Sequence, residues 1–134
     1  ACCVRLRTLD LSGNWLGDAG MAAVVNALPR SAPLATLGLR QTGSGVLAAK
    51  ALASALSEGM AVLTALWLGG NKLGPEGGKA IAEALKSGTS VLTFLNLFGN
   101  DLGDAEKQLL RDAVKGRKGF ELLYGDGAVV CVRG

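Results

Sequence analysis

Leucines along the chain follow a spacing that repeats every 28 or 29 residues. The copy that begins at Leu63 has leucine at its first, fourth, sixth and eleventh positions, and the same pattern begins at Leu6 and Leu92. In Leu-x-x-Leu-x-Leu the last two leucines are two residues apart, which is the strand period and places both on one face. Each of these three runs then meets Gly-Asn, a turn signal. The pattern therefore predicts a series of short strands, each ending at a turn.

Two further copies depart from the pattern. The copy from Leu34 keeps three leucines, but it holds Thr42 in place of the asparagine and Ser44 in place of the fourth leucine. A weaker copy begins at Phe120, matches only the first apolar positions and stops at Asp126. We therefore expect four full repeats, starting near residues 6, 34, 63 and 92, and a degenerate repeat starting near 120.

The second half of each repeat is rich in alanine and has helical spacing. In the third repeat Ala80, Ile81, Ala84 and Leu85 recur at intervals of three and four residues, which predicts a helix with one apolar stripe. The predicted start of each helix is marked by a residue that is common at helix N-termini: Asp18, Ser44, Pro75 and Asp104. Small alanines would let each helix lie close to its neighbour and to the strand layer.

The closing asparagines, Asn14, Asn71 and Asn100, need no ligand to explain them. A side-chain amide both donates and accepts, so it can bond the free backbone groups of a turn. If the repeats stack, these amides would form a ladder along the molecule. We expect that structural role because buried polar groups require partners.

The pattern resembles the leucine-rich repeat family over residues 5–125. Its period and alanine-rich half are similar to the ribonuclease-inhibitor-type subfamily, which also occurs in nucleotide-binding leucine-rich-repeat receptors and in the Ran GTPase-activating protein. The resemblance implies one α/β domain over residues 1–134, a curved horseshoe segment with a parallel β-sheet on the concave face and α-helices on the convex face. No polar capping unit precedes Leu6, so we expect the chain to be the C-terminal part of a longer solenoid.

Composition limits the chemistry that the chain can perform. It has 134 residues, 49% of them hydrophobic, and no run of 18 apolar residues, so we expect one domain without a membrane span. It has no histidine and no phosphate-binding loop, so we expect no enzyme activity, catalytic residue, cofactor or small-molecule substrate. The three cysteines Cys2, Cys3 and Cys131 show no metal-binding spacing, which favours reduced thiols in a cytoplasmic protein without a metal site.

The net charge of +3 has its main concentration near the predicted last helix. The residues concerned are Lys107, Arg111, Lys115, Arg117 and Lys118. One interpretation is a patch for nucleic acid, acidic lipid or an acidic partner. The other is an ordinary solvated helix face. We favour the second and regard nucleic acid as an improbable partner, because acidic residues share this helix and no aromatic residues interleave with its charges.

Residues between the strand leucines are predicted to point to the concave side. Three columns result, whose members are Asp10, Gly38, Trp67, Asn96 and Tyr124; then Thr8, Thr36, Ala65, Phe94 and Leu122; then Ser12, Arg40, Gly69, Phe98 and Asp126. Four of the six aromatic residues in the chain belong to these columns. Core aromatic residues need no explanation, but aromatic residues on the outward face of a sheet do.

Clustered exposed aromatic residues mark interaction sites, and Trp and Tyr are common among binding hot spots. We therefore predict an interaction module of a larger protein that binds a protein partner through its concave face. The binding residues would be Trp67, Phe94, Asn96, Phe98 and Tyr124, with Asp10, Arg40 and Glu121 in the polar rim. Alternatively, the aromatic rings pack locally over the glycines, or the apolar tail from Val129 caps the last repeat.

Two other functions remain open on the sequence. One is regulation of an enzyme, either as an inhibitor similar to ribonuclease inhibitor or as a GTPase activator that offers Arg40. The other is nucleic-acid binding through the basic last helix.

Overall fold

The computed structural model describes residues 6–27, 34–57, 63–86 and 91–124, together with the backbone of residues 128–131. Four strand–helix units follow one another, and two further strands complete the sheet. The strands are β1 (Thr8–Asp10), β2 (Thr36–Gly38), β3 (Ala65–Trp67), β4 (Phe94–Asn96), β5 (Glu121–Tyr124) and β6 (Ala128–Cys131). The helices are α1 (Gly17–Ala27), α2 (Val46–Ser57), α3 (Gly74–Lys86) and α4 (Asp104–Val114).

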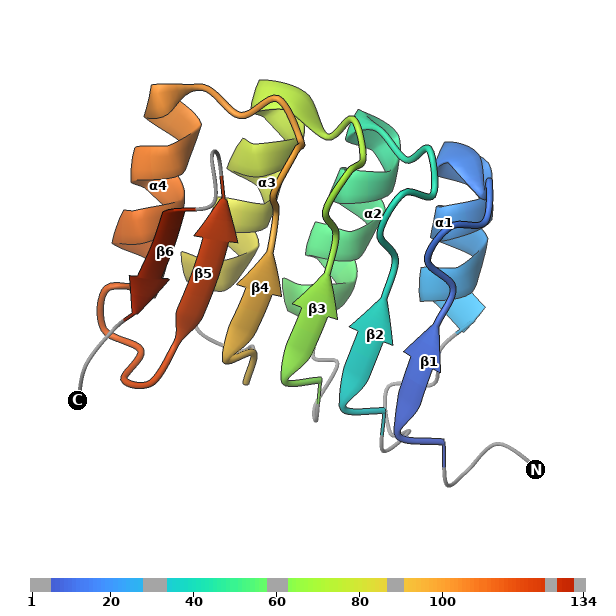
Figure 1. Cartoon of the computed structure of the whole chain (residues 1–134), viewed down its shortest axis with the longest axis horizontal. Coiled ribbons are helices and arrows are strands. Elements are labelled where there is room, and N and C mark those ends of the chain that lie inside the picture. The colour runs from blue at the N-terminus through green and yellow to red at the C-terminus, as the bar shows by residue number, and fades with distance from the viewer. Residues whose placement is uncertain (1–5, 28–33, 58–62, 87–90, 125–127, 132–134) are drawn as a thin grey trace.

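The strands lie side by side in sequence order, and the four helices form a second layer behind them (Figure 1). Strands β1 to β5 are parallel, and their central leucines pair from one repeat to the next: Leu9 with Leu37, Leu37 with Leu66, Leu66 with Leu95 and Leu95 with Leu122. This arrangement is the leucine-rich repeat solenoid that the spacing predicts. The side of β1 to β5 that faces away from the helices is called the open sheet face below.

The core lies between the sheet and the helices. Leu37, Leu66 and Leu95 have no exposed surface, because alternate strand residues point toward the helix layer. The helices contribute Leu52 and Ile81, which are also fully buried. Small residues set the spacing between helices: a Cβ added at Gly77 of α3 would lie 3.1 Å from the Cβ of Ala49 in α2.

The predicted asparagine ladder is present in the third and fourth repeats. Nδ2 of Asn71 donates to the carbonyl of Leu68 in its own repeat and to that of Leu39 in the preceding repeat, both at 2.8 Å. Asn100 repeats the arrangement, with Nδ2 donating to Leu97 at 3.0 Å and to Leu68 at 2.8 Å. Both asparagines are buried. Each amide therefore joins two successive turns.

Thr42 and Ser44 replace these polar contacts in the second repeat. Their backbone N–H groups donate to Oδ1 of Asn71 at 3.0 and 3.2 Å. The two hydroxyl oxygens are 2.8 Å apart, and both residues are fully buried. Ser44 is therefore part of the turn network, and the helix that it was expected to open begins at Val46.

The register of the fifth repeat differs from the prediction. Aligning Phe120 with Leu92 would pair Leu123 with Leu95, but Leu95 pairs with Leu122. One fewer residue separates the first apolar position from the strand. Phe120, Leu122 and Tyr124 then alternate on the buried side, as the strand period requires.

The C-terminal segment caps the last repeat by strand pairing. Strand β6 runs antiparallel to β5, with Leu122 opposite Val130 and Tyr124 opposite Ala128. It extends the sheet at the end farthest from β1 (Figure 1). Among the residues that the structure describes, no helix combines the length and the apolar character needed to cross a bilayer.

Candidate functional site

The centre of the open sheet face carries a stack of three side chains, Arg40, Trp67 and Phe94. The guanidinium carbon of Arg40 lies 5.3 Å from the centre of the Trp67 ring, within the range of a cation–π contact. On the neighbouring strand the Phe94 ring centre is 4.5 Å from that of Trp67, with the rings tilted by 41°. Both rings are half-buried, while Arg40 is exposed. The stack is thus accessible to solvent on the open sheet face.

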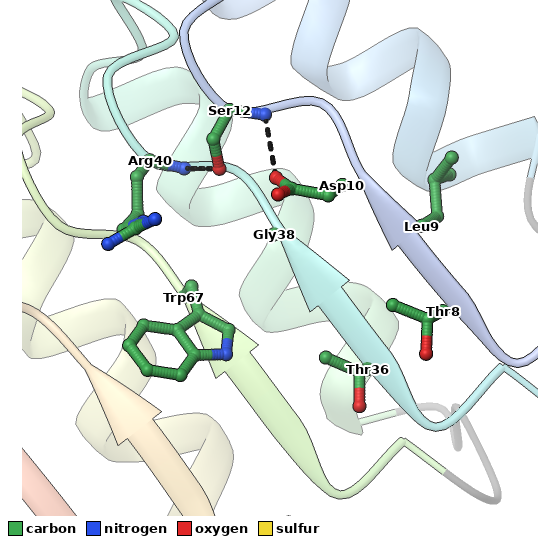
Figure 2. Close-up of a pocket in the computed structure, with 8 residues that line it drawn as sticks. All are labelled: Thr8, Leu9, Asp10, Ser12, Thr36, Gly38, Arg40 and Trp67. Carbon is green, nitrogen blue, oxygen red and sulfur yellow. Dashed lines mark hydrogen bonds between the residues drawn. The ribbon is translucent and has the colours of Figure 1, made fainter.

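The strand period places this stack. Trp67 and Phe94 flank buried leucines on β3 and β4, so their side chains point away from the helices. Gly38 pairs with Trp67 on the adjacent strand and has no side chain. A depression therefore lies beside the indole, as Figure 2 shows. Its lining residues are Thr8, Leu9, Asp10, Ser12, Thr36, Gly38, Arg40 and Trp67.

Asp10 forms the acidic side of this depression. Its Oδ1 accepts a hydrogen bond from the backbone N–H of Ser12 at 3.0 Å, and the Ser12 hydroxyl accepts one from the backbone N–H of Arg40 at 2.9 Å (Figure 2). Hydrogen bonds from the side chain and backbone of Ser12, followed by the charge of Arg40, hold the pKa of Asp10 below its usual value. The exposed carboxylate is therefore ionised at neutral pH and lies across Gly38 from the stack.

A second depression adjoins the turns that follow the strands. Arg40 and Phe98 flank it, and Phe98 is 49% exposed, so its ring is available for contact. Its floor includes Gly69, where an added Cβ would approach Oδ1 of Asn96 to 2.8 Å. That oxygen accepts a hydrogen bond from the backbone N–H of Phe98 at 3.1 Å.

The structure brings most of the predicted binding residues together. Asp10, Arg40, Trp67, Phe94 and Phe98 lie on the open sheet face at or beside the two depressions. Asn96 keeps its place in the column, but it is only 8% exposed, because its amide folds back onto the turn. It supports the turn that carries Phe98.

The predicted placement of Tyr124 on this face is wrong. Its side chain is 3% exposed and points to the core side, where its Oη accepts a hydrogen bond from Nη1 of Arg111 at 2.8 Å. The cause is the shifted register of β5, which puts Leu123 in the Trp67 column and Glu121 in the Phe94 column. Leu122 is likewise buried. Asp126 lies outside the described residues.

Sequence reasoning also missed one residue of this face. Leu123 contributes to the second depression, while Glu121, which was expected in the polar rim, is exposed at the β5 edge. The signal for Leu123 was present, since a strict two-residue alternation from Phe120 assigns residues 121 and 123 to the open side. The largest exposed aromatic residue, Trp15, was recognised only as a loop residue; it is 82% exposed.

The basic residues near the last helix do not form one free patch. Arg111 donates to Tyr124 and also to Oε1 of Gln108 at 2.6 Å. Arg117 donates to the carbonyl of Leu85 in the preceding repeat. Two of the five cations thus hold the C-terminal repeat together, which weakens the interpretation as a nucleic-acid surface.

The cysteines cannot be placed, because Cys2, Cys3 and the side chain of Cys131 lie outside the described residues. Within the described ranges, no three His, Cys, Asp or Glu side chains are arranged to hold a metal ion.

Comparison with known families gives a match over three segments. The family described as "Leucine Rich repeat" matches residues 3–25, 60–82 and 90–105. These segments contain the three repeats that close on asparagine, and they omit the two that depart from the pattern. A comparison with curated proteins gave no match.

Among solved structures, "Leiomodin-1 Actin-Binding Site 2 (ABS2)" is similar, with a TM-score of 0.77 and 19% sequence identity. The alignment covers 90% of this chain and 71% of that chain. At this identity the likeness concerns the fold. The three matched segments are similar to the leucine-rich repeat family, and the solved structure shares the solenoid fold of this chain.

Proposed function

We propose that the chain is a protein-interaction module that binds its partner on the open sheet face. The observation that carries the proposal is the half-buried Trp67 ring between Arg40 and Phe94. An exposed cation–π pair stabilises a fold by only about 0.5–1 kcal/mol. Truncation of a Trp or Arg at the centre of an interface commonly costs 2 kcal/mol or more, on the order of a thirtyfold loss of affinity. The arrangement therefore fits binding better than it fits stability.

The charges on this face suggest how a partner would be oriented. Exposed carboxylates lie at both edges of the parallel sheet, Asp10 on β1 and Glu121 on β5. The cation Arg40 lies between them, beside the aromatic rings. A complementary partner would place an acidic group opposite Arg40, apolar side chains against Trp67 and Phe98, and basic groups toward the edges. Such complementarity fixes orientation and association rate more than affinity.

The leiomodin-1 domain is named for binding actin, which makes actin the first purified protein to test on this face. The likeness in fold does not select the partner, because leucine-rich scaffolds carry many different surfaces. We further propose that the chain belongs to the ribonuclease-inhibitor-type subfamily and acts in the cytoplasm, as its period and its cysteines suggest.

The test compares four versions of the full chain: wild type, Trp67→Ala, Phe98→Ala and the control Leu47→Ala. Leu47 is 68% exposed on α2, in the helix layer behind the sheet. Each version is immobilised, proteins retained from a native lysate are quantified, and affinities are then measured with the purified candidates, beginning with actin. Circular dichroism verifies that every version is folded.

We expect wild type and Leu47→Ala to retain the same partner. We expect Trp67→Ala to weaken it by about tenfold or more, and Phe98→Ala to weaken it by a smaller factor. A partner retained equally by all four versions would place binding elsewhere. Unfolding of both aromatic variants would assign these rings to the core.

A further inference from the structure

One backbone N–H at the floor of the second depression, that of Gly69, has no hydrogen-bond acceptor among the residues that the structure describes. The N–H groups of Leu68 and Gly70 on either side of it donate to carbonyls of the fourth repeat. Successive N–H groups of an extended chain point in opposite directions, so that of Gly69 points toward the second repeat. Its carbonyl confirms this direction, because it accepts from the N–H of Gln41 at 2.9 Å.

The equivalent N–H has a side-chain acceptor in each of the other three full repeats. The N–H of Ser12 donates to Oδ1 of Asp10 at 3.0 Å, and that of Phe98 donates to Oδ1 of Asn96 at 3.1 Å. The N–H of Arg40 donates to the Ser12 hydroxyl at 2.9 Å. The acceptor therefore comes either from the residue two positions earlier or from the equivalent residue of the preceding repeat.

Neither of these sources can serve Gly69. The residue two positions earlier is Trp67, and the equivalent residue of the preceding repeat is Arg40. The indole and the guanidinium are both donors without an acceptor atom. Gly69 is buried, and a buried donor without a partner is uncommon in folded proteins. In the other repeats the acceptor belongs to a side chain of the open sheet face, so an acceptor for Gly69 would lie on that face beside Trp67 and Arg40.

Arg40 brings further donors to the same place. Its side chain lines the second depression together with Gly69, and the guanidinium carbon is 5.3 Å from the centre of the Trp67 ring. Within the described ranges the guanidinium donates no hydrogen bond of its own, so its N–H groups are available to a ligand. A carboxylate suits this pair of donors, because its two oxygens accept charge-assisted hydrogen bonds at the same time.

We propose that Gly69 and Arg40 form a binding site for one carboxylate of the protein partner, carried by an aspartate or glutamate side chain. One oxygen would accept from the N–H of Gly69, as Asp10 accepts from Ser12, and the other would accept from the guanidinium. This site rests on the proposed function, since it lies on the surface that is assigned to the partner.

The surroundings of the site favour a side-chain carboxylate over other anions. The second depression continues from Gly69 to Asp10 in one direction and to Phe98 and Leu123 in the other. A bound chain therefore has room to continue on both sides, which a chain end would not use. The ionised carboxylate of Asp10 lies at the same depression, so a doubly charged phosphate is repelled more strongly than a single carboxylate.

The test follows the Gly69 amide proton by NMR while small probes are added to the nitrogen-labelled full chain. N-acetylglutamate amide carries one side-chain carboxylate, and N-acetylglutamine amide is its neutral isostere. N-acetylglycylglycine carries its carboxylate at the chain end, and N-acetylphosphoserine amide carries a phosphate. All titrations share one ionic strength, because salt screens exposed charges.

Three variants separate the contributions of the two residues. Trp67→Asn places an amide oxygen two positions before Gly69, as Asn96 does for Phe98, so it should engage the N–H from within the chain. Trp67→Ala is the matched control, because it removes the same ring without adding an acceptor. Arg40→Met removes the charge and keeps a long side chain that does not compete for the N–H.

We expect the glutamate probe to move the Gly69 amide proton downfield until the shift saturates, and we expect the other probes to act more weakly. Arg40→Met should weaken the binding by about fivefold or more, because the bond to a charged donor is lost. Trp67→Asn should abolish the response, whereas Trp67→Ala should retain it. An equal or stronger response to any other probe would overturn the site, as would the absence of a response in wild type.

These outcomes are distinct from those of the capture experiment. A response at Gly69 without any partner that depends on Trp67 would contradict the proposed function and leave the carboxylate site standing. A partner that depends on Trp67, combined with no response at Gly69, would contradict the carboxylate site alone.

Discussion

The guanidinium of Arg40 lies 5.3 Å from the Trp67 ring, so the charge next to that ring should govern which quenchers reach it. In a Trp15→Phe background Trp67 is the only indole. We expect Arg40→Ala to reduce quenching of its fluorescence by iodide, because the cation attracts the anion. Quenching by neutral acrylamide should not fall. The change in stability should stay below about 1 kcal/mol. Unchanged iodide quenching would show that the two side chains do not associate in solution.

Gly38→Ala should raise the pKa of Asp10. The new Cβ would lie 2.5 Å from Oδ1 of Asp10, so the carboxylate must move away from the backbone N–H of Ser12. Hydrogen bonds from Ser12 are the main cause of the lowered pKa of Asp10, and their loss should raise it. An NMR titration of the Asp10 carboxyl should show a value closer to 3.8, its ordinary value.

The sign of the associated stability change follows from linkage. Because the pKa is lowered in the folded state, the carboxylate stabilises the fold above its unfolded-state pKa, and this contribution is lost as the pH falls through the folded value. Gly38→Ala should therefore reduce the dependence of stability on pH in the acid range. A pKa of Asp10 that stays low in the variant would contradict the assignment to Ser12.

Thr42→Val should destabilise the fold by about 1–3 kcal/mol even though it preserves shape, because it leaves buried polar groups without a partner. The Ser44 hydroxyl at 2.8 Å is one of these groups. The double variant with Ser44→Ala should cost less than the sum of the two single changes, since both remove the same contact. Urea unfolding measures all three. Thr93→Val, at an exposed threonine, is the control and should be within about 0.5 kcal/mol of wild type.

Tyr124→Phe should separate a structural aromatic residue from the proposed binding residues. It removes the hydrogen bond from Arg111 at 2.8 Å and should cost about 1 kcal/mol of stability. Affinity for a partner that depends on Trp67 should not change, because Tyr124 is buried away from the open sheet face. A loss of affinity similar to that of Trp67→Ala would show that the C-terminal repeat takes part in binding.

Gly77→Ala should destabilise the chain although alanine favours helices. The added Cβ would lie 2.8 Å from the Cβ of Leu73 and 3.1 Å from that of Ala49, and neither atom is the end of a flexible side chain. Overpacking of this kind costs about 1–3 kcal/mol, more than the gain of about 1 kcal/mol in helix propensity. Gly116→Ala is the matched control, since an added Cβ there meets nothing within 4 Å. Thermal melting of both variants measures the two changes in stability, and a Gly77→Ala variant as stable as wild type would contradict the overpacking.

The repeat period alone predicted the architecture, because one strand–turn–helix unit recurs and each copy reinforces the assignment of the others. It also predicted the ladder of Asn71 and Asn100, since a buried amide in a turn has few other partners. Each strand ends one residue before the second leucine of its pair. Strand β2, for example, ends at Gly38, although Leu39 is buried on the same side as Leu37. Strand ends depend on pairing with neighbours, which the period does not encode.

The candidate site was predictable only as a set of columns. Period-two alternation placed Trp67 and Phe94 on the open sheet face correctly, because repeats 1 to 4 keep a constant register. The placement of Tyr124 was wrong where that register changes by one residue before β5. The stacking of Arg40 on Trp67 depends on a neighbour in the next repeat, and the burial of Asn96 depends on its side-chain conformation, which bonds the backbone of Phe98; the alternation encodes neither.

The helices pack in a line, with extensive contacts from α1 to α2, α2 to α3 and α3 to α4. In such a linear array stability spreads from neighbour to neighbour, so opening can begin at an end without involving the middle. Amide hydrogen exchange should therefore be graded along the molecule, fastest in the first repeat and slowest in the turns joined by Asn71. An end that opens more often than the centre would also be the part most easily cut by a protease.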